Sequence, residues 1–175
     1  MIGLEKGVVK VMPYTAEWSR LFEAEKARLE AAVGAYILDI QHIGSTSIPG
    51  MPAKPIIDLG VAVQNFEEAT VCIEPLRQLG YTYYGEAGIP RRHYFAKGQP
   101  ETHHLHMNEL HSHDWEVTLL FRDYLIQHPE VAQEYANLKL KLAQQFPADR
   151  EAYLAGKGPF IEQALRLARS SRRTP

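Results

Sequence analysis

The segment between residues 35 and 63 constrains the fold more strongly than any other part of the chain. Residues 55–63, PIIDLGVAV, form a nearly continuous apolar run, which is typical of a strand buried on both faces. Residues 35–43, AYILDIQHI, also predict a strand, and GSTSIPGMPAK joins the two. A simple corner between strands needs only about four residues. The longer connection, rich in Gly, Ser and Pro, indicates that this corner holds a ligand.

The rest of the chain places these two strands in an α+β fold. Apolar residues at helical spacing predict a helix between Thr15 and Gly34 and another over residues 66–79. Short β-rich segments predict further strands at residues 8–14, 81–85, 91–97 and 103–110. From Asp114 onward the spacing is helical, and the last helix is expected to begin after Gly158-Pro159. We expect one domain over residues 1–175, with a mixed α/β core at 8–112 and a helical part at 113–171.

Composition narrows the classes of function. Lys and Arg total 19 against 21 Asp and Glu, so the net charge of −2 gives no overall positive field for nucleic acid, and none is expected as a partner. No segment approaches the roughly 18 apolar residues that span a bilayer, so we expect no membrane association. The single cysteine, Cys72, forms no internal disulfide, which fits a cytoplasmic protein. No sequence feature indicates a protein partner.

The corner after the first strand has the chemistry of an anion site. A glycine followed by hydroxyl residues at a helix start presents backbone N–H groups and hydroxyls to a phosphate, and we predict contacts from Gly44, Ser45 and Thr46. Lys54 adds a positive charge if the loop folds back. Asp58 on the next strand is unfavourable beside phosphate unless a cation lies between them, which predicts Mg²⁺ or Mn²⁺. The alternative is a helix cap beside a partly exposed strand end.

The stretch HIGSTSIPGMPAKPIID (42–58) resembles the signature of the GrpB family, which is placed in the nucleotidyltransferase superfamily. Further matches follow in order over residues 14–168, namely HYF (93–95), HHLHM (103–107), FRDYLIQHPEVAQEY (121–135), LK (138–139) and GKGPFI (156–161). The resemblance implies a nucleotidyltransferase-like, polymerase-beta-type fold, with a mixed sheet, flanking helices and a helical C-terminal part. A related domain is fused to some dephospho-CoA kinases. The resemblance supplies no substrate.

The chain departs from the superfamily at the metal site. The superfamily generally carries two acidic residues two positions apart on the second strand, and here the pair is Asp58 and Gly60. Where a third acid is expected, His104 and His106 share one face of a strand. With Asp58 they are predicted as catalytic residues and as ligands that suit Zn²⁺ or another transition metal. Either histidine also suits a general base, a phosphate contact or a half-buried structural position.

Basic residues complete the predicted phosphate site. Only one of Arg91 and Arg92 faces inward from its strand, and Arg122 is the first choice for a forked contact to oxygens. The alternative for Arg122 is a surface salt bridge to Asp123 or to a nearby glutamate. The predicted phosphate or substrate contacts in full are His42, Gly44, Ser45, Thr46, Lys54, Arg92, Arg122, Lys139 and Lys157.

Two functions fit these residues. The first is metal-dependent transfer of a nucleotidyl or phosphoryl-type group from a nucleoside triphosphate to a small acceptor. The second is a catalytically inactive module that binds a nucleotide or phosphometabolite, with a link to coenzyme A metabolism. The missing acid at Gly60 favours the module, while the retained Ser, Asp, His and Arg set favours the enzyme. A metal-dependent hydrolase that uses the histidine pair is a third, weaker hypothesis.

Overall fold

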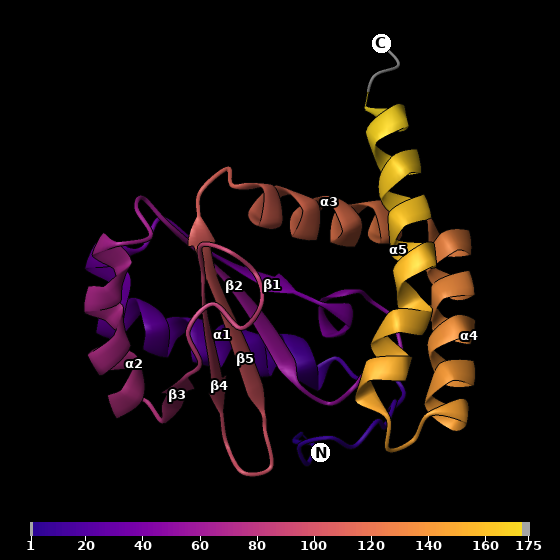
Figure 1. Cartoon of the computed structure of the whole chain (residues 1–175), viewed down its shortest axis with the longest axis horizontal. Helices are drawn as coiled ribbons and strands as arrows, with labels where there is room; N and C mark the ends of the chain where they lie inside the picture. Colours follow the sequence, from indigo (N-terminus) through magenta and orange to yellow (C-terminus); the bar gives the residue numbers. More distant parts are fainter. Residues whose placement is uncertain (1, 173–175) are drawn as a thin grey trace.

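The structure is a computed structural model that describes residues 2–172. Five strands form one mixed sheet in the order β1-β2-β5-β4-β3, and helices flank it (Figure 1). The strands are β1 (Asp39–Ile43), β2 (Ile57–Val63), β3 (Tyr81–Tyr83), β4 (Arg92–Lys97) and β5 (His103–Glu109). The α-helices are α1 (Glu17–Val33), α2 (Ile73–Gln78), α3 (His113–Gln127), α4 (Pro129–Gln145) and α5 (Arg150–Ser171). The predicted α+β class is therefore confirmed.

The pairing of β2 with β5 brings distant parts of the chain together. β2 pairs antiparallel with β1 and parallel with β5, while β4 joins β5 and β3 by antiparallel pairing. The parallel register places Asp58 opposite His104 and Gly60 opposite His106. Because side chains at positions i and i+2 share one face of a strand, all four positions face the same side of the sheet.

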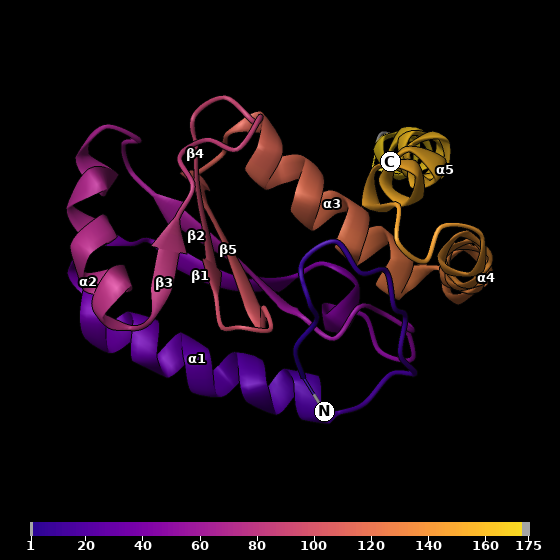
Figure 2. The same ribbon diagram turned by 60° about the horizontal axis from the view of Figure 1, so that its bottom comes forward.

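The two faces of the sheet have different tasks. Ile57, Leu59, Leu105 and Met107 are fully buried in the main core, where side chains of α1 and α2 also pack. These alternating apolar residues account for the near-continuous burial predicted for residues 55–63. Figure 2 shows α1 along this face of the sheet, while α3, α4 and α5 lie on the other side. The polar face is therefore turned toward the C-terminal helices.

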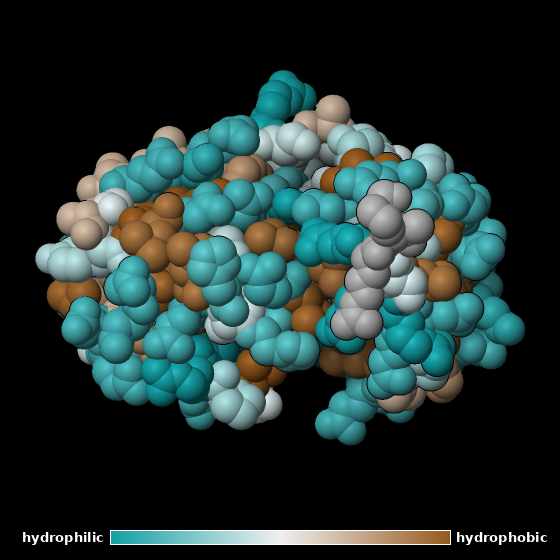
Figure 3. Space-filling model, turned by 90° about the horizontal axis from the view of Figure 1, so that it is seen from above, coloured by the Kyte–Doolittle hydropathy of each residue, from teal (hydrophilic) through white to brown (hydrophobic). Residues whose placement is uncertain are grey.

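The C-terminal helices hold the corner loop in place. Ile48 and Met51 of this loop share a buried cluster with Leu125 of α3 and Tyr135 of α4. Helices α4 and α5 lie side by side at one end of the molecule (Figure 1). On the face shown in Figure 3 the surface is largely hydrophilic, and its largest apolar group lies on the sheet half, at the left. Within residues 2–172, no helix is both long and apolar enough to cross a membrane.

Two predicted elements are wrong. Residues 8–14 form no strand, and only Met12 makes an isolated bridge, to Ala53, because the segment packs against the C-terminal helices through Val9. Helix α5 begins at Arg150 and continues through Pro159, so its predicted start after that proline is about ten residues late. Asp149 caps this earlier start by accepting a hydrogen bond from the Ala152 N–H at 3.0 Å.

Two other helix boundaries differ in detail. Gly34 does follow the last residue of α1, but it continues into a short 3₁₀ turn over Gly34–Tyr36. The helix predicted over residues 66–79 is a 3₁₀ turn, Glu68–Cys72, followed by the short α2. Gly156 lies inside α5 where α4 packs closely. A Cβ at this position would be only 2.5 Å from Leu142 Cδ2 of α4. That glycine permits the close approach of the two helices.

Candidate functional site

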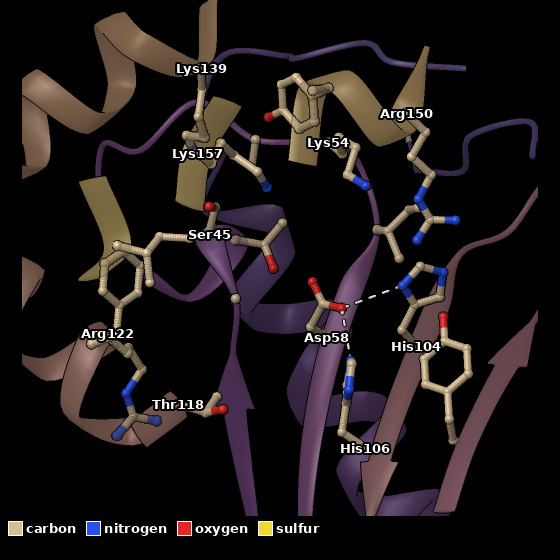
Figure 4. Close-up of a pocket in the computed structure, with 18 of the residues that line it drawn as sticks. Ser45, Lys54, Asp58, His104, His106, Thr118, Arg122, Lys139, Arg150 and Lys157 are labelled. Carbon is tan, nitrogen blue, oxygen red and sulfur yellow. Dashed lines mark hydrogen bonds and ion pairs between the residues drawn. The ribbon is translucent and has the colours of Figure 1, made fainter. Parts of the chain in front are cut away.

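A cavity of about 580 Å³ lies between the polar face of the sheet and the C-terminal helices. Its walls come from the corner loop, from β2, β4 and β5, and from α3, α4 and α5 (Figure 4). Within the described chain, seven cationic and two carboxylate side chains line it. The cations are Lys6, Lys54, Arg92, Arg122, Lys139, Arg150 and Lys157, and the carboxylates are Asp58 and Glu101. This excess of positive charge favours an anionic ligand.

Asp58 lies at the centre of the sheet side of the cavity. Its Oδ1 atom is 3.5 Å from His104 Nδ1 and 3.4 Å from His106 Nε2 (Figure 4). Its side chain keeps 28% of its surface accessible, and that surface opens into the cavity. Burial raises the pKa of Asp58, but hydrogen bonds from His104 and His106 and the charge of His104 outweigh it and hold the pKa well below its usual range. Asp58 is thus an anion at neutral pH.

His104 bridges two carboxylates. Its Nε2 atom lies 3.0 Å from Glu101 Oε2, on the side opposite Asp58. Burial lowers the pKa of His104, but the hydrogen bonds and charges of Asp58 and Glu101 outweigh it, so the pKa lies above its ordinary value. Both ring nitrogens therefore have partners. The result is a hydrogen-bonded row of carboxylate, imidazolium and carboxylate along the floor of the cavity.

His106 is fixed by an arginine. Arg92 Nη1 lies 3.3 Å from His106 Nδ1, and a guanidinium can only donate, so Nδ1 accepts and carries no proton. The proton on Nε2 is then donated to Asp58 Oδ1. Arg92 is 7% exposed, and the Glu86 and Ala87 carbonyls accept its remaining hydrogen bonds. Arg91 instead faces solvent and pairs with Glu67, so only one of the two arginines faces inward, as predicted.

The glycine corner meets Asp58 directly. Gly44 has φ +69° and begins a 3₁₀ turn over Ser45–Ser47, so it adopts a conformation that few other residues tolerate. A Cβ on Gly44 would lie 2.5 Å from Asp58 Oδ2. Ser45 and Thr46 both line the cavity, although Thr46 is only 1% exposed. The corner and the carboxylate, which were predicted to be neighbours, are in contact.

Three lysines converge on the helical side of the cavity. Lys139 is 1% exposed, donates to the Pro52 carbonyl at 2.5 Å and lies over the Tyr135 ring. Burial first, and then the charges of Lys157 and Lys54, lower the pKa of Lys139 to about 7. Burial and the charge of Lys54 lower the pKa of Lys157 to about 8. Burial also lowers the pKa of Lys54. Among residues 2–172 no carboxylate forms an ion pair within 4.0 Å with any of the three lysines, and a bound anion would supply such a partner.

Arg150 is a cavity residue that sequence reasoning missed. Its buried Nε atom has no hydrogen-bond partner among residues 2–172. Figure 4 shows its guanidinium beside Lys54 and above His104. Arg150 is also the first residue of α5, where a cation opposes the helix dipole. A cation in this unfavourable place indicates a functional residue. The sequence reveals it only when the start of α5 is predicted correctly.

Two predicted phosphate contacts have partners inside the protein. His42 does not line the cavity: it stacks on Phe22 with ring centroids 4.6 Å apart, and its Nε2 lies 3.0 Å from Thr46 Oγ1. Burial lowers the pKa of His42 to about 4, so it is no imidazolium at neutral pH. Arg122 borders the cavity, but its guanidinium donates to Gln41, to the His42 carbonyl and to Asp123.

The expected metal ligands come together without forming a metal site that the geometry supports. Asp58, His104 and His106 converge, yet within residues 2–172 no group of three or more His, Cys, Asp or Glu side chains is placed to hold a metal ion. Gly60 faces Ile43 and Trp115, and a Cβ there would meet them at 3.2 and 3.3 Å. With glycine here, β2 offers no second carboxylate beside Asp58. Two magnesium ions shared by an acidic pair therefore do not fit this site.

The fold and the cavity define a class of small α+β proteins with an electropositive pocket against a polar sheet face. A family model described as GrpB protein matches residues 8–167. The chain belongs to the GrpB family, as its motifs indicated. The Glutamate-rich protein GrpB of Alkalihalophilus pseudofirmus is 37% identical over 171 residues, which cover 94% of this chain and 98% of that protein.

Further relatives show the same region in other contexts. The crystal structure of conserved protein GrpB from Enterococcus faecalis has a TM-score of 0.88 and 34% identity, covering 94% of this chain and 100% of that one. UPF0157 protein YqkA of Bacillus subtilis is 46% identical over 160 residues, and the match spans 91% of this chain but 47% of that protein. A dephospho-CoA kinase of Mycolicibacterium paratuberculosis is 28% identical over 196 residues, 94% of this chain and 47% of the kinase.

Proposed function

We propose that the protein binds a phosphorylated small molecule, a nucleotide or another phosphometabolite, in the 580 Å³ cavity. The observation that carries this proposal is the cluster of Lys54, Lys139 and Lys157 beside the unpaired Nε of Arg150 in the described chain. Buried cations that depress one another's pKa are stabilised when an anion enters between them. Phosphate supplies several charged oxygens for such a cluster.

The corner residues support the same ligand. Gly44 and Ser45 begin the turn that lines the same cavity, and Figure 4 shows Ser45 beside Lys157, where hydroxyl and N–H groups suit a phosphate. His104 offsets one of the two negative charges of Asp58 and Glu101, so the remaining negative charge is smaller than the positive charge of Lys54, Lys139, Lys157 and Arg150. The relatives described as dephospho-CoA kinases favour a coenzyme A precursor among the phosphometabolites to be tested.

Transfer of a nucleotidyl or phosphoryl group from a nucleoside triphosphate to a small acceptor is the second candidate. It is favoured by the contact between the Gly44 corner and Asp58, which is the arrangement that a nucleotidyltransferase-like fold implies. In nucleotidyl transfer an acceptor oxygen forms the new bond to the α-phosphorus, a base takes its proton and pyrophosphate leaves. His104 and His106 already have partners on the nitrogens that would serve as base. Binding is therefore the function that the geometry supports best.

Isothermal titration calorimetry tests the proposal. Inorganic triphosphate, the four ribonucleoside triphosphates and phosphorylated coenzyme A precursors are titrated with and without Mg²⁺ or Mn²⁺. We expect binding without a divalent ion, and an affinity about tenfold weaker in Lys157→Gln because a charge-assisted contact is lost. Lys141→Gln, which removes an exposed lysine of α4 outside the cavity, is the matched control.

Each outcome decides between the candidates. The anion site is contradicted if no probe binds. It is also contradicted if Lys157→Gln and Lys141→Gln lower the affinity for the probes equally. Release of pyrophosphate from a nucleoside triphosphate, abolished by Asp58→Asn, establishes transfer. Binding that appears only with Mg²⁺ or Mn²⁺ supports the metal-dependent alternative.

A further inference from the structure

A second chamber opens from the floor of the cation-lined cavity. It has a volume of about 280 Å³ and lies between the polar face of the sheet and the first turns of α3. Both spaces share five lining residues, Gly44, Asp58, Arg92, His106 and Thr118. Because these residues border both spaces, the two chambers are parts of one site, with Asp58 and His106 at the junction. Figure 4 shows these two side chains facing each other beneath the lysine side of the cavity.

The walls of the second chamber differ in chemistry from those of the first. They are mainly apolar and come from Ile43, Ile89, Trp115 and Leu119, and none of the lysines of the first cavity reaches it. The polar groups beyond the junction are Asn108 and Asp114, joined by a hydrogen bond of 3.0 Å from Asn108 Nδ2 to Asp114 Oδ2. Apolar walls with a few fixed polar groups are typical of sites that bind the uncharged part of a ligand.

Gly60 keeps this chamber open. It lies opposite His106 in the sheet, and the space where its side chain would be is bordered by Ile43 and Trp115. A Cβ there would be 3.2 Å from Ile43 Cγ2 and 3.3 Å from Trp115 Cζ3, so any side chain would compete with a ligand for the space. The backbone of Gly60 does not require glycine, since its φ lies outside the left-handed range. The absence of a side chain at Gly60 therefore leaves space in the chamber and is not needed for a turn.

We propose that the ligand has two parts, which are held in the two chambers. Its phosphates lie among Lys54, Lys139, Lys157 and Arg150, and a compact, largely apolar ring-bearing group lies between Ile89 and Trp115. The bond between the two parts passes Asp58 and His106. This inference rests on the proposed function, because it takes the first cavity to be the phosphate site.

The test compares ligands that share a triphosphate and differ in the second part. Inorganic triphosphate and the four ribonucleoside triphosphates are the probes, and each dissociation constant is measured by calorimetry on the full chain. We expect at least one nucleoside triphosphate to bind about tenfold tighter than inorganic triphosphate, because its ring buries apolar surface in the chamber. In Gly60→Ala this advantage is lost, while the affinity for inorganic triphosphate stays within about twofold.

A second variant keeps the test independent of the fold of β2. Ile89→Ala removes an apolar wall from a loop outside the strands, and Ile126→Ala, an exposed position on α3 away from both chambers, is its control. Ile89→Ala is expected to weaken the favoured nucleoside triphosphate alone, and Ile126→Ala to change neither ligand. The inference is overturned if all nucleoside triphosphates bind no tighter than inorganic triphosphate, or if Ile89→Ala weakens both equally. If no probe binds at all, the proposed function fails with it.

Discussion

Gly44 and Asp58 are so close that a methyl group on the glycine would overlap the carboxylate. The Cβ of an alanine at this position would lie 2.5 Å from Asp58 Oδ2 and 3.0 Å from its Cβ. The backbone of Gly44 also has φ +69°, which is unfavourable for alanine. We expect Gly44→Ala to lower the free energy of unfolding by roughly 2 to 4 kcal/mol. Urea denaturation measures this loss.

Gly50→Ala separates the two causes. Gly50 has φ +77° but nothing within 4 Å of its Cβ position, so its substitution carries the backbone cost alone, roughly 1 kcal/mol. The excess loss in Gly44→Ala then reports the contact with Asp58. If both variants lose the same unfolding free energy, the Asp58 carboxylate can move away from a side chain at position 44 without cost.

The charge on Asp58 controls the protonation of His104. In Asp58→Asn the imidazolium loses one of its two carboxylate partners while burial, which lowers its pKa, remains, so we expect the pKa of His104 to fall. Titration of the imidazole proton resonances by NMR measures the shift. Glu101→Gln is the matched variant on the other nitrogen, and it lowers the same pKa through a different carboxylate. A pKa of His104 that is unchanged in both variants would contradict the bridging arrangement.

The same pair makes stability depend on pH. The lowered pKa of Asp58 contributes stability that is present above its unfolded value of about 4 and is lost as the pH falls. The raised pKa of His104 contributes stability that is present below its unfolded value of about 6.5 and is lost as the pH rises through the folded value. The difference in unfolding free energy between wild type and Asp58→Asn is therefore greatest between about pH 4 and 6.5. A difference that stays constant from pH 3 to 9 would exclude the ion pair.

Anion binding is expected to weaken as the pH rises. The lysine cluster is fully charged only well below the pKa of Lys139, about 7, and it loses charge as the pH rises through that value and through the pKa of Lys157, about 8. Sulfate keeps its charge over this range, so its affinity reports the protein alone. We expect it to fall between pH 6 and 9 and proton uptake to accompany binding near pH 7.5, measured by calorimetry in two buffers of different ionisation enthalpy. In Lys157→Gln the pKa of Lys139 rises, because the charge of Lys157 no longer lowers it, so the decline begins at higher pH, while Lys141→Gln leaves the profile unchanged.

Arg122 is expected to stabilise the protein more than it binds ligand. It links α3 to β1 by donating to Gln41 and to the His42 carbonyl, both at 2.9 Å. Loss of these hydrogen bonds in Arg122→Ala is expected to lower the unfolding free energy by about 2 kcal/mol. The dissociation constant for inorganic triphosphate should change less than in Lys157→Gln. If Arg122→Ala lowers the binding free energy for inorganic triphosphate by more than it lowers the unfolding free energy, Arg122 is a direct phosphate contact.

The sequence was informative where chemistry is local. The Gly44 corner and Asp58 on β2 belong to one continuous segment, and alternation along β5 placed His104 and His106 on one face. The helical side of the site was harder to predict. Arg150 joins it only because Asp149 starts α5 about ten residues earlier than the apolar pattern indicated. Residues 8–14 had the composition of a strand, but they join neither edge of the sheet and pack against α4 and α5 instead.

The partners of His42 and Arg122 could not be predicted from spacing. The ring of His42 stacks on Phe22, which is 20 positions away in the chain and belongs to a different element. Arg122 reaches β1 across an even longer separation. Basic residues in a phosphate-like sequence context look alike until their hydrogen bonds are known. Tertiary contacts therefore decide which cations stay free to meet a ligand.

Along β2 and β5, residues that face the core alternate with residues that face the cavity. The residues that stabilise the fold are therefore distinct from those that would contact a ligand. Ile57, Leu59, Leu105 and Met107 maintain the core, while the residues between them point into the site. We expect substitutions at the intervening positions to change which ligand binds and to leave the packing beneath the sheet unchanged. Such a sheet can diverge in chemistry while its shape is inherited, which fits one domain that occurs both as a GrpB protein and within dephospho-CoA kinases.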